Sequence, residues 1–209
     1  MEGISKGYGD LQLFDKASAR VVRGDHIALI GENGKGKTTL LKLIAGVEAA
    51  TQGEVEMGHH VDKVFYAQHQ VEGLEVGNTI FEELEKAHPD CTYADIRRTL
   101  GALLFVKDEV NKKIKVLSGG EKARVALAKV ILSGANFLIL DEPTNHLDMV
   151  SIDILMRALQ RYEGTLILVS HNRYFVERLA NKIWYIEQGK VKEFADGYQA
   201  YDFWKKNRR

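Results

Sequence analysis

Short apolar runs alternate with amphipathic segments along the whole chain. Three of these runs are unbroken, at Ile27–Ile30, Phe137–Leu140 and Leu166–Val169, as expected for parallel strands that are covered on both faces. Two more runs, Ala19–Val22 and Val64–Ala67, also predict strands. Because helical patterns separate the runs and no internal repeat is visible, we expect an α/β protein with a mostly parallel sheet.

Six helices are predicted from residues that favour helix starts, and a hairpin is predicted near the end of the chain. The helices follow Gly36, Thr79, Thr92, Ser118, Asp148 and Asn172. The helix after Asp148 carries an apolar stripe formed by Ile152, Leu155, Met156 and Leu159. Residues Lys182–Ile186 and Lys190–Phe194, separated by Gln188-Gly189, are typical of a β-hairpin.

The middle of the chain differs in kind from its flanks. Residues 78–115 are helical and polar in pattern and contain no strand run. Together with the helix after Ser118, they predict a helical subdomain at about residues 78–134 that is inserted in the α/β core. A length of 209 residues suits one large domain, so residues 1–209 are expected to form a single domain.

Composition narrows the class of protein. Hydrophobic residues make up 45% and charged residues 28% of the chain, which is typical of a soluble globular protein and excludes a disordered one. No apolar run approaches the roughly 18 residues of a membrane helix, and no signal peptide is visible. The single cysteine, Cys91, excludes an internal disulfide and suits a reducing compartment. We therefore expect a cytoplasmic protein without membrane insertion.

Charge gives no general reason to expect a polyanionic partner. Lys and Arg total 29 and Asp and Glu total 29, so the formal net charge is zero. A basic tail closes the chain, formed by Lys205, Lys206, Arg208 and Arg209. A solvated helix end is the favoured interpretation of this tail, and a nucleic-acid contact is the alternative.

Glycine is unusually frequent, with 19 residues against 2 prolines, and the glycines cluster. One cluster matches G-x-x-x-x-G-K-[ST] directly after the predicted strand Ile27–Ile30, which predicts a loop whose N–H groups wrap phosphates at a helix N-terminus. Lys37 would neutralise the β- and γ-phosphates, and the Thr38 hydroxyl would ligate Mg²⁺. The predicted loop consists of Gly31, Glu32, Asn33, Gly34, Lys35, Gly36, Lys37, Thr38 and Thr39.

Two carboxylates end another predicted strand. Asp141 and Glu142 follow Phe137–Leu140, and ligands of parallel sheets bind at the carboxyl ends of strands. Asp141 would hold Mg²⁺ through water, and Glu142 would polarise the water that attacks a phosphate. The alternative is a strand that ends in a solvated acidic turn.

A second glycine cluster opens the helix after Ser118. Ser118 and Glu121 have the spacing of a capping box. Gly119 and Gly120 lie in the first turn, where each glycine costs up to about 1 kcal/mol. This cost is reasonable where a ligand must approach the backbone, so these four residues form a second predicted phosphate-facing element.

Taken together, these motifs resemble those of the ATP-binding-cassette (ABC) ATPases over essentially the whole chain. The motifs stand in the family's order, at Gly31–Thr38, Gln68, Leu117–Glu121, Leu138–Glu142, Leu147-Asp148 and His171. The resemblance implies a P-loop fold with a mostly parallel core sheet, an antiparallel β subdomain and a helical subdomain. It also implies ATP as substrate and Mg²⁺ as cofactor.

Three further site residues come from the resemblance alone. Tyr8 lies where the family has an aromatic residue that stacks on adenine, although a core or edge-strand tyrosine is the alternative. Gln68 matches the glutamine that contacts Mg²⁺ and the attacking water. His171 matches the histidine that contacts the γ-phosphate. The implied catalytic residues are thus Glu142, His171 and Gln68, and the implied metal-site residues are Thr38, Gln68 and Asp141.

Within this superfamily, the chain is most similar to the ABC-F group. The run Asp141-Glu142-Pro143-Thr144-Asn145-His146-Leu147-Asp148 is characteristic of that group. Asn172 departs from the pattern, which usually has Asp at this place, but Asn also caps helices. The resemblance implies a ribosome-associated ATPase that acts in translation. With zero net charge, any contact with ribosomal RNA would need local patches such as Lys112, Lys113, Lys115 and the basic tail.

The resemblance also implies a second cassette. In this family the glycine-rich helix start of one cassette completes the phosphate site of another, so two copies form a homodimer or a tandem pair. Only seven residues precede Tyr8, where the family has a complete first strand, so we expect the second cassette of a longer protein or a fragment of one. The ATPase subunit of a membrane transporter, and a binding module without turnover, are the competing hypotheses.

Overall fold

A computed structural model describes residues 1–67, 70–145 and 147–207 of the chain. The chain divides into two compact units. The first unit comprises Met1–Phe65, Asn136–Glu142 and Glu163–Arg209, and the second comprises Tyr66–Ala135 and Pro143–Tyr162. The prediction of a single domain spanning residues 1–209 stays a prediction.

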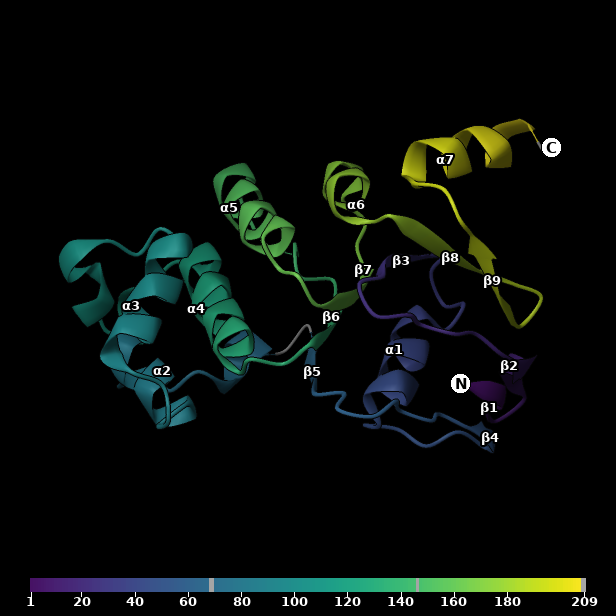
Figure 1. The fold of residues 1–209 in the computed structure, drawn as a ribbon, viewed down its shortest axis with the longest axis horizontal. Coiled ribbons are helices and arrows are strands. Elements are labelled where there is room, and N and C mark those ends of the chain that lie inside the picture. Colours follow the sequence, from purple (N-terminus) through teal and green to yellow (C-terminus); the bar gives the residue numbers. More distant parts are fainter. Residues whose placement is uncertain (68–69, 146, 208–209) are drawn as a thin grey trace. The chain divides into compact units, whose positions relative to one another are not determined.

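A six-stranded sheet is the centre of the first unit (Figure 1). Its strand order is β5 (Lys63–Tyr66), β6 (Phe137–Asp141), β7 (Thr165–Val169), β3 (His26–Ile30), β8 (Lys182–Glu187) and β9 (Lys190–Phe194). Strands β6, β7, β3 and β8 run parallel, whereas β9 is antiparallel to β8. Every residue of β6 and β7 is buried, as their unbroken apolar runs predict.

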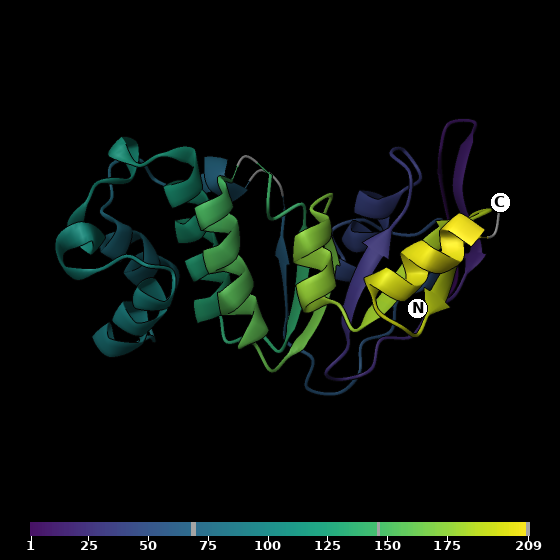
Figure 2. The same ribbon diagram turned by 90° about the horizontal axis from the view of Figure 1, so that it is seen from above.

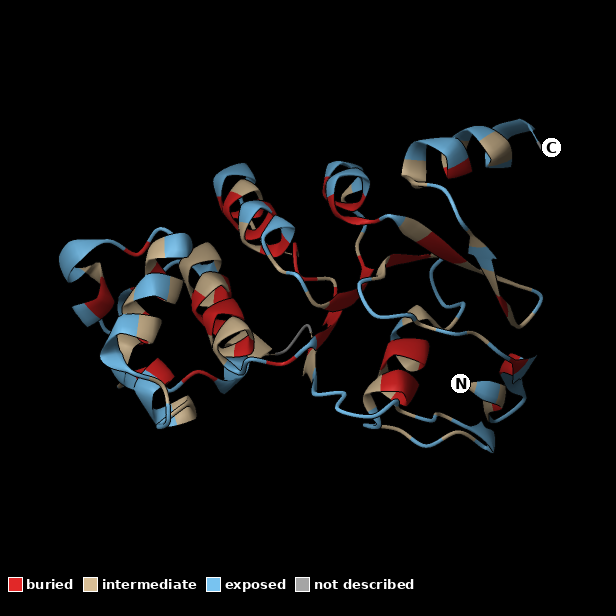
Figure 3. Ribbon diagram, in the orientation of Figure 1, coloured by how far each residue is buried: buried red, intermediate tan, exposed pale blue. Residues whose placement is uncertain are grey.

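Helices cover both faces of this sheet. Helix α1 (Lys37–Ala45) lies on one face, and α6 (Arg173–Leu179) and α7 (Tyr198–Asn207) lie on the other (Figures 1 and 2). The buried side of α1 is formed by Leu40, Leu41, Leu43 and Ile44, which belong to the same core cluster as Ile167 of β7 (Figure 3). The predicted α/β architecture is therefore confirmed.

A separate antiparallel sheet packs into the same core. It contains β1 (Glu2–Tyr8), β2 (Leu11–Ala17) and β4 (Gln52–Glu54), in the order β2-β1-β4. The prediction of a strand at Ala19–Val22 is wrong, because these residues connect β2 to β3. The chain turns there through a hydrogen bond from the Val22 N–H to Asp25 Oδ2 (2.8 Å) and one from the Asp25 N–H to the Val22 carbonyl (3.0 Å).

The second unit is helical. It contains α2 (Ile80–Ala87), α3 (Tyr93–Ala102), α4 (Gly119–Leu132) and α5 (Met149–Gln160), with short 3₁₀ turns at Gln70–Gly73, Lys107–Asn111 and Ile114–Val116. Its helices α2 to α4 thus lie inside the predicted helical range of 78–134. All four residues of the predicted stripe on α5 are buried. No helix in the described part of the chain is both long and apolar enough to cross a membrane.

The predicted helix starts and the hairpin are confirmed. Thr79, Thr92 and Ser118 each form a capping box, and the side chains of Asp148 and Asn172 cap α5 and α6. Strands β8 and β9 form the hairpin, and its two turn residues, Gln188 and Gly189, have φ values of 51° and 70°. Positive φ at both positions is the requirement of a tight hairpin turn whose twist matches the strands.

A buried ion pair joins two helices of the second unit. The Glu83 side chain on α2 is only 4% exposed, and its Oε1 lies 2.7 Å from Nζ of Lys129 on α4. The Asn78 side chain donates to the other oxygen at 2.8 Å. A buried carboxylate is tolerated only when charge and hydrogen bonds offset its lost hydration, so this pair fixes how α2 meets α4.

The substitution Lys129→Met should therefore lower the free energy of unfolding by about 1–3 kcal/mol, because it leaves Glu83 buried without its cation. The double variant Glu83→Leu/Lys129→Met should recover most of this loss. Urea denaturation of the two variants and the parent chain measures both effects. A single variant as stable as the parent would show that the ion pair does not hold α2 against α4.

Candidate nucleotide site

The glycine-rich loop connects β3 to α1 in a shape that needs glycine at two places. Gly34 and Gly36 have φ values of 77° and 92°, and a Cβ on Gly36 would lie 2.9 Å from the ring of Phe14. Gly36 is also the N-cap of α1 and offers no side-chain acceptor to the first N–H groups of the helix. Those N–H groups, at the positive end of the helix dipole, form an anion-binding geometry.

The Lys37 ammonium folds back over this loop. Its Nζ donates to the carbonyl oxygens of Gly31 (2.9 Å) and Glu32 (3.0 Å) and, more weakly, to Asn33 Oδ1 (3.4 Å). Burial lowers the pKa of Lys37, and the negative charges of Glu142 and Asp141 oppose that shift. Lys37 thus lies close to both acidic residues, with donors that an anionic ligand could take over.

Asp141 ends β6 with a carboxyl group that is almost wholly buried. The residue is 5% exposed, and burial raises the pKa of this carboxyl against the Thr38 hydrogen bond and the charges of Lys42 and Lys37. Its Oδ1 atom has no hydrogen-bond partner among the described residues. Natural proteins rarely leave a buried oxygen unsatisfied, so Asp141 Oδ1 keeps an unused acceptor that an ion or a water could engage.

These oxygens suit the Mg²⁺ that the resemblance implies. Mg²⁺ prefers oxygen ligands, is usually held by one or two carboxylates together with substrate phosphates, and keeps several waters. The Asp141 carboxylate and the Thr38 hydroxyl provide such oxygens. No group of three or more His, Cys, Asp or Glu residues able to hold a metal by itself occurs in the described residues. The site therefore fits a cation that is bound together with phosphate.

Glu142 lies at the end of β6 in a strained conformation. Its φ is 50°, in the left-handed region that residues with a side chain seldom adopt. The Glu142 N–H donates to the Val169 carbonyl of β7 (2.9 Å), and Glu142 Oε2 accepts from the His171 backbone N–H (3.2 Å). Backbone strain of this kind persists where the surroundings dictate it, and it is common at functional sites.

His171 follows β7 and lies beside Glu142. Its Nε2 is 3.3 Å from Glu142 Oε1, at an angle that does not make a hydrogen bond, and its side chain is 64% exposed. The parallel strands β3, β7 and β6 therefore bring Lys37, His171, Asp141 and Glu142 to one edge of the sheet. Asn172, the departure from the family pattern, caps α6 by accepting from the Phe175 N–H at 3.1 Å.

Tyr8 lies next to the first turn of α1. Its hydroxyl hydrogen-bonds the Thr39 side chain and donates to Glu48, and the Lys6 ammonium lies 5.2 Å from the centre of its ring. The hydrogen bond to Glu48 raises the pKa of Tyr8. Tyr8 is the last residue of β1, the central strand of the small sheet, and it is half-exposed, so its ring is accessible beside the loop.

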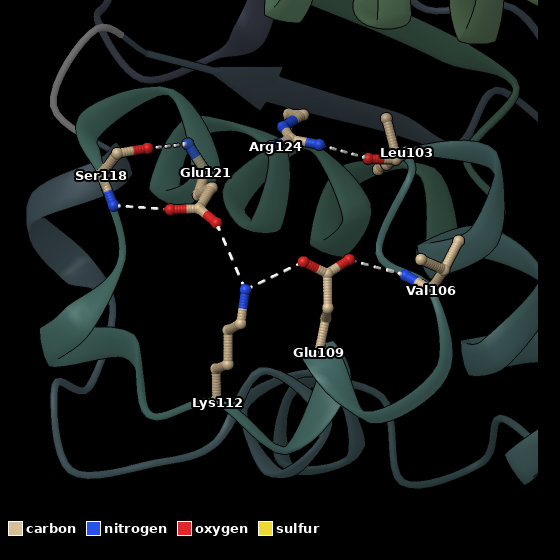
Figure 4. A network of polar contacts seen from close by, with 7 residues as sticks. All are labelled: Leu103, Val106, Glu109, Lys112, Ser118, Glu121 and Arg124. Atoms are coloured by element: carbon tan, nitrogen blue, oxygen red, sulfur yellow. Dashed lines mark hydrogen bonds and ion pairs between the residues drawn. The ribbon is translucent and has the colours of Figure 1, made fainter.

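The second glycine cluster lies in the second unit, at the start of α4 (Figure 4). The Ser118 N–H donates to Glu121 Oε2 (2.8 Å), and the Glu121 N–H donates to Ser118 Oγ (3.2 Å), which is the predicted capping box. A Cβ on Gly119 would meet no atom of another element within 4 Å in the described part of the chain, but one on Gly120 would lie 2.9 Å from Ser151 Oγ of α5. A side chain at position 120 would therefore clash with Ser151, so packing alone explains this glycine. No such clash explains the glycine at position 119.

Several of the predicted site residues make few contacts, and two residues that act on the site were not predicted. The side chains of Lys35 and Glu32 form an exposed pair at 4.0 Å, and Gln68 lies outside the described residues. Lys42 acts on Asp141, and Glu48 binds Tyr8, although neither belongs to a motif. The position of Lys42 one turn after the loop was a usable clue, because a helix brings it back to the same face. Nothing in the sequence pointed to Glu48.

The parallel sheet, the glycine-rich loop before α1 and the acidic end of β6 define a P-loop ATP-binding cassette. The sequence profile of the family described as ABC transporter matches residues 14–145, and the chain belongs to this family.

Among characterised sequences, the chain is similar to ABC transporter F family members. It is 42% identical over 202 residues to ABC transporter F family member 5 of Arabidopsis thaliana, covering 96% of this chain and 29% of that protein. It is 43% identical over 189 residues to the putative ATP-binding protein YdiF of Bacillus subtilis, covering 90% of this chain and 29% of that protein. The chain therefore spans less than a third of the length of these two relatives.

Solved structures share the fold at low sequence identity. The ATP-binding cassette MJ0796, in a dimeric post-hydrolysis state bound to ADP and phosphate, superposes with a TM-score of 0.77 at 19% identity, over 94% of this chain and 98% of that one. A second dimeric structure of MJ0796 gives the same TM-score at 21% identity and the same coverage. At these identities the likeness shows the fold, which is the predicted cassette fold.

The strain at Glu142 can be measured by comparing Glu142→Gly with Glu142→Ala. Both variants lose the carboxylate, but only glycine adopts a positive φ without steric cost. The glycine variant should therefore be more stable than the alanine variant by about 1 kcal/mol. Urea denaturation measures the difference. An alanine variant as stable as the glycine variant would mean that the residue relaxes and stores no strain.

Proposed function

We propose that the chain is an ATP-binding and ATP-hydrolysing cassette of the ABC-F kind, which works as one half of an ATP-gated clamp. The observation that carries this proposal is the meeting of Lys37, Asp141, Glu142 and His171 at the ends of three parallel strands. A cation of the loop, a buried carboxylate with an unsatisfied oxygen and a Glu–His pair are the parts that phosphoryl transfer needs.

We assign the binding roles as follows, with these contacts in support. The N–H groups of residues 31–39 would wrap the phosphates, and Lys37 would exchange its carbonyl partners for phosphate oxygens. Thr38 and Asp141, with Gln68, would hold Mg²⁺, which when bound neutralises charge on the phosphates. The accessible ring of Tyr8 would stack on adenine. On this proposal, the two compact units are the core and the helical part of one domain.

The catalytic roles belong to Glu142 and His171, with Gln68. The Glu142 carboxylate would accept a proton from a water molecule as its oxygen attacks the γ-phosphorus in line. The bond from that phosphorus to the oxygen of ADP breaks and leaves its electron pair on ADP. His171, whose side chain is largely exposed, would contact the γ-phosphate. The strained Glu142 backbone supports this role, and the Glu142 carboxylate accepts from the His171 N–H just after β7.

A second cassette completes the site in this proposal. Ser118, Gly119, Gly120 and Glu121 would approach the γ-phosphate held by the loop of another cassette, either a second copy of this chain or a tandem domain. The open position of Gly119 supports this arrangement, because a Cβ there would meet no atom of another element among the described residues within 4 Å. ATP would shift the population toward the closed pair, and loss of the γ-phosphate would release it.

The variant Glu142→Gln tests the catalytic role. Glutamine keeps an oxygen that accepts from the His171 N–H but cannot take a proton from water. The variant should bind ATP with unchanged affinity, should lose at least about 100-fold in turnover, and should accumulate as ATP-bound pairs. Isothermal titration, phosphate release and sedimentation velocity measure the three properties. Undiminished turnover would refute the role of Glu142.

We further propose that the partner is the ribosome and that the protein acts in the cytoplasm during translation. The similarity to F family members supports this, together with the local lysines Lys113 and Lys115, whereas Lys112 is paired with Glu109 at 2.8 Å. With ATP, the Glu142→Gln variant should sediment with ribosomes and not with membrane vesicles. Sedimentation with membranes alone would favour the ATPase subunit of a transporter instead.

A further inference from the structure

Four charged side chains gather at the start of α4, two of each sign (Figure 4). Glu109 and Lys112 come from the 3₁₀ turn at Lys107–Asn111 and the residue that follows it, and Glu121 and Arg124 come from the first turns of α4. They lie around the helix end that the proposed function assigns to phosphate. We refer to these four residues as the charge network.

Glu121 is held at the helix end by its own cap. Its Oε2 accepts from the Ser118 N–H at 2.8 Å, so the carboxylate cannot move away without breaking the capping box. Its Oε1 lies 3.9 Å from Lys112 Nζ, which also contacts Glu109 Oε1 at 2.8 Å. Glu109 is fixed in turn, because its Oε2 accepts from the Val106 N–H at 3.1 Å.

Arg124 supplies the second positive charge. Its Nη1 donates to the Leu103 carbonyl at 2.8 Å, and its guanidinium lies 4.7 Å from the centre of the Phe105 ring. The pKa of Glu109 is lowered mainly by the hydrogen bond from Lys112, with a smaller contribution from the charge of Arg124. Arg124 and Lys112 therefore both act on Glu109, and the formal charges of the four side chains sum to zero.

This cancellation matters because a carboxylate is the wrong group to place beside an anion. The N–H groups at the start of α4 attract a phosphate, but an uncompensated Glu121 would repel it over the same distances. We propose that Lys112 is a positioning residue that acts through Glu121: it offsets the charge of that carboxylate, so that the start of α4 accepts a phosphate while keeping its capping box. This inference rests on the proposed function of the Ser118–Glu121 segment.

A set of variants changes the charge of the network in steps. Lys112→Gln makes the network negative, Glu121→Gln makes it positive while keeping an oxygen for the cap, and the double variant restores neutrality. Lys86→Gln is the matched control, because Lys86 is an exposed lysine of the same unit that pairs with Glu75 outside the network. Melting temperatures should stay within about 2 °C of the parent chain, since exposed ion pairs contribute little to stability.

The first measurement follows inorganic phosphate binding to the chain alone, through the amide resonances of Gly119 and Gly120. Lys112→Gln should weaken the apparent affinity roughly three- to tenfold, Glu121→Gln should strengthen it, and the double variant and Lys86→Gln should match the parent within about twofold. The differences should shrink in 1 M salt. If the two amides do not respond to phosphate in the parent, or if the double variant stays as weak as Lys112→Gln, the inference is overturned.

The second measurement uses the same variants in the Glu142→Gln background and determines the ATP concentration that gives half-maximal pairing. Lys112→Gln should need more ATP for half-maximal pairing than the background chain, Glu121→Gln should need less, and the double variant and Lys86→Gln should match the background. If the background chain does not pair at all, the clamp is refuted, and the phosphate titration still decides the role of Lys112. If pairing occurs with equal ATP dependence in every variant, the proposed function stands and the inference about Lys112 falls.

Discussion

The burial of one carboxylate, that of Asp141, organises the rest of the site. Strand β6 is covered on both faces, so its last residue keeps a charged group almost out of water. The hydrogen bond from Thr38 and the charges of Lys42 and Lys37 offset the lost hydration of this carboxylate. All three residues belong to the loop and helix that follow β3. The loop and the acid therefore depend on each other, and β7, which lies between β3 and β6, carries His171 to the same edge.

Local chemistry decided what could be predicted from the sequence. Thr79, Thr92 and Ser118 mark helix starts because a cap involves only residues three positions apart. Unbroken apolar runs mark β6 and β7 because both faces are buried. Strands β1 and β2 leave no such mark, since only two residues of β1 and three of β2 are buried and β1 contains glycines. The apolar run Ala19–Val22 misled because a connection between strands also contains a few apolar residues.

The same distinction between local and tertiary features applies to the candidate site. Residues 31–39, Asp141 at the end of β6 and Glu142 directly after it lie in short motifs, and their residue types and spacing indicate their chemistry. The strain of Glu142, the contact of Glu48 with Tyr8 and the approach of Ser151 to Gly120 are tertiary contacts, which no short motif encodes. Gly120 is an example. Its place in a glycine cluster indicated a ligand, and the structure shows that Ser151 of α5 lies where a side chain on residue 120 would be.

The central claim is that one chain holds two different half-sites and that a complete site needs a second cassette. The dependence of ATPase rate on chain concentration, at saturating ATP and Mg²⁺, tests this most directly. If two copies must meet, the rate should rise more than linearly with concentration until the pair is saturated. A rate strictly proportional to concentration down to the nanomolar range would contradict the account, because each chain would then hydrolyse ATP on its own.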